Sequence, residues 1–302
     1  MKKSVSLLLA GLMLCGALTG CGSSNDSANY GEGGESQTAE SGETAGTTGA
    51  IHVVSREDGS GTRGAFVELT GVEDDNGDNT TVDAEIANRT DAVLTTVAGN
   101  EAAIGYVSLG SLNDTVKAVK VDGVEATVEN VKSGDYTLSR PFNIATKGEP
   151  TGVAKDFINF ILSADGQAIV EEENYIKVDD AAPAFTSDGS SGQIAVGGSS
   201  SVSPVMEKLI EAYKAVNPNA QIDLQTSDST SGMTGAMDGT FAIGMASREL
   251  KDEEAAELTG TAIALDGIAV IVNTANTVEN LTMDQIRSIY VGETTDWSEV
   301  AE

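Results

Sequence analysis

The sequence predicts an α/β fold for the part of the chain that follows residue 50, and three observations support this prediction. Short apolar runs suited to strands alternate with segments whose apolar residues recur every three or four positions, the period of a helix. Loops rich in glycine and serine lead from the strands into the helices. The first fifty residues show neither pattern. Such alternation favours a mainly parallel sheet covered by helices.

The apolar patterns also locate the individual elements. Strands are expected at 51–54, 103–107, 118–121, 142–145, 193–196, 222–224, 241–244 and 268–272. Helices are expected around 66–69, 153–161, 205–213 and 283–289. Ser203 followed by Pro204 predicts the start of the third helix, with the serine as its cap. Thr282 with Gln285 three residues later predicts a capping box at the start of the fourth.

The composition excludes several functions. The chain has 302 residues, with 47 acidic and 17 basic side chains and a formal net charge of −30. Binding to nucleic acid or to an anionic lipid surface needs clustered Lys and Arg, so both are disfavoured. Two Cys and one His leave little for thiol chemistry, a zinc site or a His-based triad. The acidic runs 171–173 and 252–254 are interpreted as solvated helix faces. We therefore expect a binding protein, with no enzymatic activity, metal or cofactor.

The N-terminus predicts export and attachment to a membrane. Lys2 and Lys3 precede an apolar run over 5–18, which is short for a transmembrane helix and typical of a signal peptide. The following Leu-Thr-Gly-Cys21 resembles the lipobox of bacterial lipoproteins, which implies removal of 1–20 and a lipid on the Cys21 sulfur. An ordinary secretory peptide with a chance cysteine is the alternative. Residues 21–50 lack large aliphatic side chains and predict a disordered tether. The body would then be a monomer held at the extracytoplasmic face of the cell membrane.

Three loops have the composition of an anion site. The first, 54–64, follows a strand and precedes a helix, and it offers Arg56, Ser60, Gly61 and Thr62. Its glycines would let successive N–H groups face one point at a helix N-terminus, and Asp58 would hold Arg56. The loop 197–204 adds Ser200, Ser201 and Val202, and the loop 227–233 adds Thr230 and Ser231. Hydroxyls and one guanidinium at helix starts indicate reversible capture of a small oxyanion.

Several motifs of the sequence resemble those of one known protein family. They are REDGSGTRGAF, GSSSVSP, STSGM, IGMASREL and DGIAVIVN, extended by AIGYVSLGSL, FINFILSADGQAIVEEENYI and LTMDQIRSIYVGETTDWSEV. Together they are similar to the phosphate-binding lipoproteins of Pst-type ABC importers over nearly all of 51–302. The resemblance implies a two-domain periplasmic-binding-protein clamp of type II, with mixed sheets flanked by helices, that captures inorganic phosphate between its domains and delivers it to a membrane permease. It implies that Arg56, Ser60, Gly61, Thr62, Ser201, Thr230 and Ser231 face the ligand, with Asp58, Ser200 and Val202 in support.

The order of these motifs is rotated relative to the family. The GSS-type loop usually comes first and the DGSGT-type loop later, whereas here the order is reversed, so the chain is expected to be circularly permuted. One lobe would comprise 51–139 plus 267–302. The other would comprise 140–266 and include a connector at 179–192. A fragment of a tandem protein is the rival interpretation.

At one position this chain departs from the family pattern in a way that affects the choice of ligand. The resemblance places an acidic residue, which accepts the proton of hydrogen phosphate, where this chain has Ala242. We therefore expect weaker rejection of sulfate, unless Asp228 or Asp238 takes that role. Binding of another tetrahedral oxyanion, such as sulfate or molybdate, is an alternative function, and so is a surface or adhesion lipoprotein that keeps the fold. A hydrolase with Ser60 as nucleophile is disfavoured because the sole histidine, His52, lies within a strand and is interpreted as structural.

Overall fold

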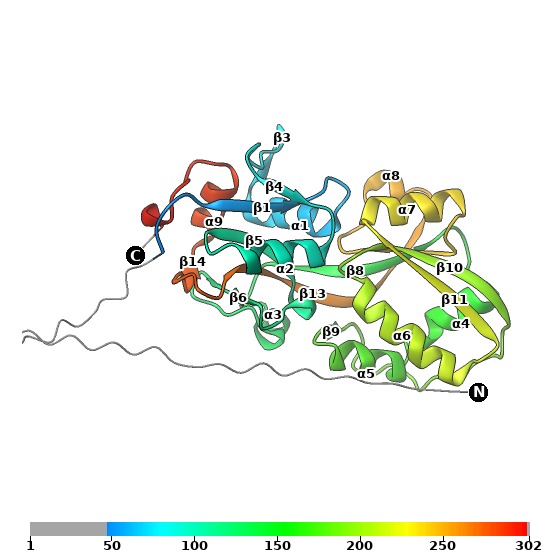
Figure 1. Cartoon of the computed structure of the whole chain (residues 1–302). Coiled ribbons are helices and arrows are strands. Elements are labelled where there is room, and N and C mark those ends of the chain that lie inside the picture. The colour runs from blue at the N-terminus through cyan, green and yellow to red at the C-terminus, as the bar shows by residue number, and fades with distance from the viewer. Residues whose placement is uncertain (1–46, 301–302) are drawn as a thin grey trace, which may run out of the picture. The chain divides into compact units, whose positions relative to one another are not determined.

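A computed structural model describes residues 47–300, in which one large mixed sheet carries two groups of helices (Figure 1). The strand order along the sheet is β11-β10-β12-β8-β13-β5-β1-β4, and β6 and β9 pair with β13 beside this path. Residues 1–46 lie outside the described part of the chain, so the predicted signal peptide, Cys21 and most of the predicted tether do too.

The first group of elements surrounds β1, β4 and β5. It comprises β1 (His52–Arg56), α1 (Gly61–Thr70), β2 (Glu73–Asp74), β3 (Gly77–Asp78), β4 (Glu85–Ala87), α2 (Thr90–Gly99), β5 (Ala103–Ser108), β6 (Val116–Ala118), β7 (Lys120–Val121), α3 (Val128–Ser133), β14 (Asn280–Leu281) and α9 (Met283–Tyr290). Short 3-10 turns at Leu109–Ser111 and Trp297–Glu299 complete it.

The second group surrounds β10, β11 and β12. It comprises α4 (Gly152–Ile161), α5 (Ala164–Glu172), β9 (Ile176–Lys177), β10 (Gly192–Ser199), α6 (Ser203–Val216), β11 (Ala220–Ser227), α7 (Ser229–Asp238), β12 (Ile243–Ala246) and α8 (Asp252–Ala255). Two long strands, β8 (Ser139–Thr146) and β13 (Thr259–Asn273), run from one group to the other (Figure 1).

Strand direction differs between the ends and the middle of the sheet. β1 is parallel to β4 and β5, and β10 is parallel to β11 and β12, as expected for strands joined through helices. Every pairing of β8 and β13 is antiparallel. The prediction of a mainly parallel sheet is therefore wrong for the centre, because the two crossing strands run in opposite directions. The mixed α/β fold implied by the resemblance is confirmed.

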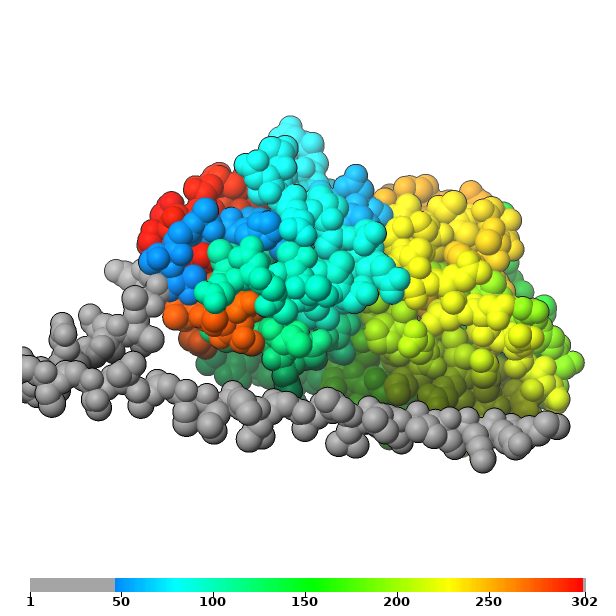
Figure 2. All heavy atoms as spheres, in the orientation of Figure 1, coloured from blue at the N-terminus to red at the C-terminus, as the bar shows by residue number. Residues whose placement is uncertain are grey.

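The buried side chains form two large hydrophobic cores and one small cluster beside the second. The first core gathers α1, α2, β1, β5, α9 and the later half of β13. The second gathers α4, α6, β10, β11 and the earlier half of β13. In Figure 2 the blue, cyan and red segments of the first group accordingly share one side of the molecule, and the yellow and green segments share the other. Two cores support the predicted division into lobes at about 140 and 267, which stays a prediction.

The two predicted helix starts have different outcomes. Thr282 caps α9, accepting from the backbone N–H of Gln285 while the Gln285 side chain accepts from the backbone N–H of Thr282, so the capping box is confirmed. Ser203 does not cap α6. The cap position is Val202, and the Ser203 hydroxyl donates back to the carbonyl of Ser199 instead. The serine is used to hold the preceding loop, while Pro204 sits in the first turn as expected.

The two ends of the described chain lie side by side. Ala50 forms an antiparallel bridge with Asp296, and the backbone N–H of Ile51 donates to the carbonyl of Thr295. Thr47 also bonds to Thr277. Residues 47–50, placed in the tether by the sequence prediction, thus belong to the body.

The predicted connector 179–192 is packed onto the second core. Ser187 and the backbone of Asp188 both donate to the Asp156 carboxylate, and Phe185 meets Phe160 with ring centroids 5.2 Å apart. The carbonyl of Pro183 accepts from the backbone N–H of Ala164, the first residue of α5. The connector is therefore an attached strap, not a free linker.

This arrangement predicts that the chain tolerates new termini. A rearranged chain, opened between Gly189 and Gly192 and closed by a short glycine linker from Val300 to Ala50, should fold cooperatively, because both cores keep all their elements. Circular dichroism and thermal unfolding of the body would measure this. A matched rearrangement opened inside β13, at Ala269, should fail to fold. Failure of both would contradict the prediction.

Candidate functional site

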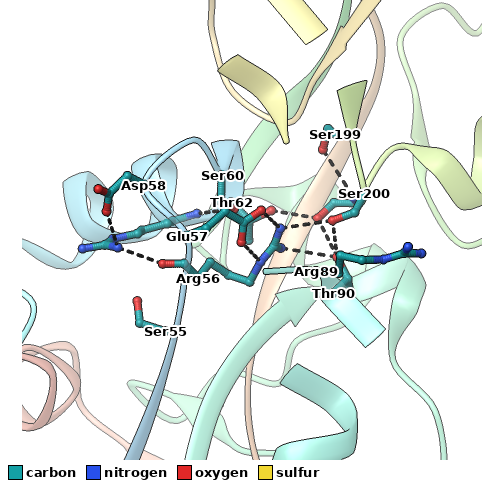
Figure 3. Close-up of polar contacts among 12 residues, drawn as sticks. Ser55, Arg56, Glu57, Asp58, Ser60, Thr62, Arg89, Thr90, Ser199 and Ser200 are labelled. Carbon is teal, nitrogen blue, oxygen red and sulfur yellow. Dashed lines mark hydrogen bonds and ion pairs between the residues drawn. The ribbon is translucent and has the colours of Figure 1, made fainter. Parts of the chain in front are cut away.

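The carboxyl ends of the parallel strands converge on one polar region (Figure 3). β1 ends at Arg56 before α1, and β4 is followed by Thr90, the first residue of α2. From the other group, β10 ends at Ser199 and β12 is followed by Ser247. Loops at the carboxyl ends of parallel strands are the usual ligand positions in α/β folds.

Buried hydroxyls from both groups of elements bond to one another there. We call Thr62, Thr90, Ser199, Ser200, Ser201 and Ser247 the hydroxyl network; each is at most 7% exposed. Thr62 Oγ1 lies 2.9 Å from Ser201 Oγ and 3.3 Å from Ser247 Oγ. Thr90 Oγ1 lies 3.2 Å from both Ser200 Oγ and Ser201 Oγ. Ser199 Oγ donates to Ser247 Oγ at 3.0 Å.

Arg56 reaches this network from β1. Its Nε and Nη2 donate to the two Glu57 carboxylate oxygens at 2.8 Å each, which is a bidentate pair. The rest of the guanidinium faces the other group of elements: Nη2 donates to Ser200 Oγ at 3.1 Å, and Nη1 to Thr90 Oγ1 at 3.4 Å. Its own backbone N–H donates to the Tyr106 hydroxyl, whose pKa burial raises to about 12. Hydrogen bonds thus hold both the backbone N–H and the guanidinium of Arg56.

Two further buried arginines flank the network. Arg140 donates through Nη1 to Asp266 and through Nη2 to Thr62 Oγ1 at 3.3 Å. Arg248 donates to both Glu254 oxygens, at 2.7 and 2.8 Å, and to Thr230 Oγ1 at 3.3 Å. Glu254, assigned by the sequence prediction to a solvated helix face, is only 3% exposed because it holds Arg248.

These arginines determine how the hydroxyls can bond. A guanidinium only donates, so Ser200, Thr90, Thr62 and Thr230 each use their oxygen as an acceptor toward an arginine. Their own hydrogens must then point elsewhere. Each arginine is matched by one carboxylate, namely Glu57, Asp266 or Glu254, so the pairs add no net charge. The region is therefore rich in oriented donors while remaining close to neutral.

Glycines let the two groups of elements approach closely at this point. A Cβ on Gly59 would lie 2.3 Å from Asp228 Oδ1, and one on Gly61 would lie 2.4 Å from Ser229 Oγ. The backbone N–H of Thr230 donates to the Gly59 carbonyl at 3.1 Å. Neither glycine has a positive φ. The loop thus needs these glycines for contact with the α7 loop, whereas the sequence prediction assigned them to backbone turning.

The predicted site residues fall into four groups. Arg56, Thr62, Ser200 and Ser201 meet in or at the hydroxyl network. Ser60 and Gly61 begin α1, where Ser60 Oγ accepts from the N–H of Arg63, and Thr230 bonds to Arg248. Val202 supports the loop through its apolar side chain in the second core. Ser231 is exposed and bonds to Asp228, the cap of α7, so it lies outside the network.

The predicted role of Asp58 is wrong. Its side chain is 97% exposed and pairs with Arg63 at 2.8 Å, while Glu57 holds Arg56. Asp58 lies in the turn between β1 and α1, where its carboxylate faces Arg63 instead of Arg56.

Ala242, where the resemblance places an acid, takes no part in the hydroxyl network. Ala242 lies before β12, where its backbone N–H bonds to Ala195 and its side chain packs on the second core. The residue that β12 brings to the network is Ser247. Asp238 sits at the far end of α7 and bonds to Thr240, so it cannot substitute. Asp228 is committed to capping α7 at Ser231.

Several residues of the site were not anticipated from the sequence. Thr90 follows a strand of only three residues, which the apolar pattern did not reveal. Ser247 directly follows β12, which spans Ile243–Ala246, whereas the strand predicted at 241–244 ends too early to mark this hydroxyl. Arg140 and Asp266 lie within long strands, and nothing in their local sequence indicates that they pair. Arg248 directly follows Ser247, and its buried partner Glu254 lies in a run that the sequence analysis interpreted as a solvated helix face.

One cavity adjoins the network, and a second lies against two of the arginines that bond to hydroxyls of the site. One of ≈ 300 Å³ is lined by Arg89, Thr90 and Ser200 together with residues of α6. The other, of ≈ 380 Å³, is lined by Arg140 and Arg248 together with Gly64 and Ala65 of α1. The hydroxyls of Thr90 and Ser200 line the cavity of ≈ 300 Å³, so a small ion entering this cavity would contact them.

The geometry offers Ser60 no histidine base. His52 begins β1, whereas Ser60 lies beyond its other end, and the His52 ring bonds to Glu85 at 2.8 Å. Within residues 47–300, no group of three or more His, Cys, Asp and Glu side chains is placed to hold a metal ion. No helix in the same range is long and apolar enough to cross a membrane.

The fold and site together define an α/β substrate-binding protein. The family model described as a PBP superfamily domain matches residues 33–165 and 183–302.

Comparison with individual proteins identifies the family within this class. The chain is 48% identical to phosphate-binding protein PstS 2 of Streptococcus agalactiae serotype V over 99% of both chains. It is 43% identical to PstS 2 of Streptococcus pneumoniae serotype 4 over 99% of this chain and 100% of that protein. A crystal structure of a phosphate-binding protein of a phosphate ABC transporter from Streptococcus pneumoniae TIGR4 is similar with a TM-score of 0.69 and 46% identity, covering 84% of this chain and 100% of that one. The chain belongs to the PstS family of phosphate-binding proteins.

The Arg248–Glu254 pair predicts a pH-dependent contribution to stability. Burial raises the pKa of Glu254, but hydrogen bonds from Arg248 and from the backbone N–H of Lys251 outweigh it, so the pKa lies below its ordinary value. A carboxylate with a lowered folded-state pKa stabilises the fold above its unfolded pKa, and this contribution is lost as the pH falls through the folded pKa. Glu254→Gln should therefore lower the free energy of unfolding by about 1–3 kcal/mol at pH 7.

Denaturant unfolding at pH 7 and at successively lower pH would measure the difference between the two proteins. It should shrink as the pH falls through the lowered folded-state pKa of Glu254, because the carboxyl group of the wild type is then protonated too. Glu253→Gln is the matched control, since Glu253 is exposed on the same helix. A difference that persists unchanged at low pH would contradict the assignment.

Proposed function

We propose that this chain captures inorganic phosphate at the hydroxyl network and delivers it to the permease of an ABC importer. Membership of the PstS family supports the ligand class. The observation that carries the proposal is the arrangement of buried hydroxyls whose oxygens accept from arginines held by carboxylates. Hydroxyls arranged in this way have hydrogens to offer to an oxyanion.

The two groups of elements supply complementary parts of the proposed site. Thr62, Thr90 and Arg56 come from the first group, and Ser199, Ser200, Ser201 and Ser247 come from the second. In this structure their hydroxyls bond directly across the boundary, as Thr62 does with Ser201 at 2.9 Å. An oxyanion between them would accept these hydrogens, and the N-termini of α1 and α2 would add their dipoles. Binding would thus join the two predicted lobes, as in a clamp.

Selectivity follows from the acceptors at the site. Hydrogen phosphate carries a proton that needs an acceptor, whereas sulfate has none to donate. The carboxylates of Glu57 and Asp266, which hold Arg56 and Arg140, are each engaged by an arginine. A serine hydroxyl such as that of Ser247 can either accept or donate. We therefore still expect the site to reject sulfate only weakly. The structural reason is Ser247, whose hydroxyl can donate to sulfate, and not Ala242.

The function predicts a defined anion preference that depends on Arg56. Titration calorimetry of the body with phosphate, arsenate, sulfate and molybdate should show tight binding of phosphate and arsenate and weaker but measurable binding of sulfate. Arg56→Ala should weaken phosphate binding by about 100-fold, because it removes charged donors to Ser200 and Thr90 and leaves Glu57 unpaired.

Arg287→Ala is the control, since Arg287 lies on α9 and bonds to Gly71 and Glu293. It should bind phosphate as the wild type does. Absence of phosphate binding by the wild type would refute the proposal. Preference for sulfate or molybdate would favour the alternative of another oxyanion importer, and absence of all anion binding would favour a surface lipoprotein that retains the fold.

Attachment to the membrane through Cys21 is part of the same proposal. The sequence around Cys21 supports it, and a protein that serves a permease needs to stay near it. We expect Cys21→Ala to release the chain from the membrane fraction into the medium, because the acyl chains provide the anchor. Fractionation of expressing cells, with detection of the chain in each fraction, would measure this. Equal retention of both proteins would contradict lipidation at this position.

A further inference from the structure

Arg140 occupies the point where the chain crosses between the two cores. It pairs in register with Asp266 across β8 and β13. On one side of this pair, Leu138 and Ile268 belong to the first core. On the other, Phe142 and Ala264 belong to the second. A residue at this position is held by both halves of the molecule.

The guanidinium of Arg140 divides its donors between the crossing and the site. Nη1 donates to the Asp266 carboxylate and to the Gly267 carbonyl, the latter at 2.9 Å. Asp266 is itself fixed by the Ser108 hydroxyl at 2.7 Å. Nη2 donates in the other direction, to Thr62 Oγ1 at 3.3 Å. At 4% exposure, Arg140 has little freedom to move.

Stability alone is a poor explanation for this residue. A buried ion pair contributes little net stability, because desolvation offsets the attraction. The Nε–H of Arg140 is buried and has no hydrogen-bond partner among residues 47–300, which adds a further cost. Burial correspondingly raises the pKa of Asp266, with Arg140 opposing that shift. Arg140 also contacts the Gly267 carbonyl and the Phe142 ring, but among its contacts the one that reaches the hydroxyl network is the one to Thr62.

That contact determines the direction of one hydroxyl. Thr62 Oγ1 accepts from Arg140, so its single hydrogen is left for Ser201, for Ser247 or for a bound oxyanion. Arg56 and Arg248 donate to other hydroxyls, namely Ser200, Thr90 and Thr230. Within the described chain, Arg140 is the arginine that acts on Thr62.

Resting on the proposed function, we propose that Arg140 is a positioning residue for anion capture. It keeps Thr62 a donor toward the phosphate oxygens, and Asp266 holds it in place at the crossing of the two cores. Arg140 acts through Thr62 and not as a separate anion contact. The effect of changing Arg140 must therefore depend on whether the Thr62 hydroxyl is present.

A double-mutant cycle with Arg140→Lys and Thr62→Val tests this dependence. Lysine keeps a positive charge for Asp266 but lacks the fork that serves Asp266 and Thr62 together, so the fold should survive. Phosphate affinity would be measured by calorimetry, and thermal unfolding would confirm that each variant is folded. Arg287→Lys is the control for an arginine-to-lysine change away from the site.

The expected result is strong non-additivity. Thr62→Val should weaken phosphate binding about tenfold and Arg140→Lys about fivefold, while the double variant should remain about tenfold weaker than wild type. A structural or separate contact role would instead make the double variant about fiftyfold weaker. That additive result, or wild-type affinity of Arg140→Lys, would overturn the inference while leaving the proposed function intact. A wild-type chain that does not bind phosphate would overturn both.

Discussion

The site depends on the pairing of each buried guanidinium with a single carboxylate. A charge taken out of water is costly unless it is paired and hydrogen-bonded. Arg56, Arg140 and Arg248 meet this requirement through Glu57, Asp266 and Glu254. Once so fixed, each arginine has a donor left over, and that donor meets a hydroxyl, which is Ser200 for Arg56, Thr62 for Arg140 and Thr230 for Arg248. Each pair therefore makes one hydroxyl an acceptor toward its arginine, so that the hydrogen of that hydroxyl is donated to another group.

The sheet places these pairs where they can act together. Parallel strands at its two ends present their carboxyl ends and the following helix starts to a common region. The antiparallel strands β8 and β13 join the two ends and contribute Arg140 and Asp266 from their middle. Close approach at Gly59 and Gly61 then brings the α1 loop against the α7 loop. A side chain at either glycine would separate the hydroxyls by pushing the loops apart.

The large negative charge of the chain is compatible with capture of a small anion. At −30, the chain as a whole repels a polyanion, which agrees with the exclusion of nucleic acid. Exposed charges farther than about 8 Å from a site are largely screened at physiological salt. The groups at the network act at contact distance, and their arginines and carboxylates cancel. Oriented donors and helix N-termini, which do not depend on net charge, remain to hold the ligand.

The sequence by itself determined the α/β class, the longer strands, the helices α1, α4, α6 and α9, the capping box of α9 and the loops that carry Arg56, Thr62, Ser200 and Ser201. These features are local, because apolar period and turn residues are set by neighbours in the chain. Only the tertiary structure decided that Glu57 and not Asp58 holds Arg56, that the centre of the sheet is antiparallel, and that Thr90, Ser247 and the Arg140–Asp266 pair complete the site. Arg140 and Thr62 are 78 positions apart, and Ser108 and Asp266 are 158 apart. Such contacts depend on which strands become neighbours. Burial of apolar residues throughout the body determines that arrangement, and the residues adjacent in sequence do not.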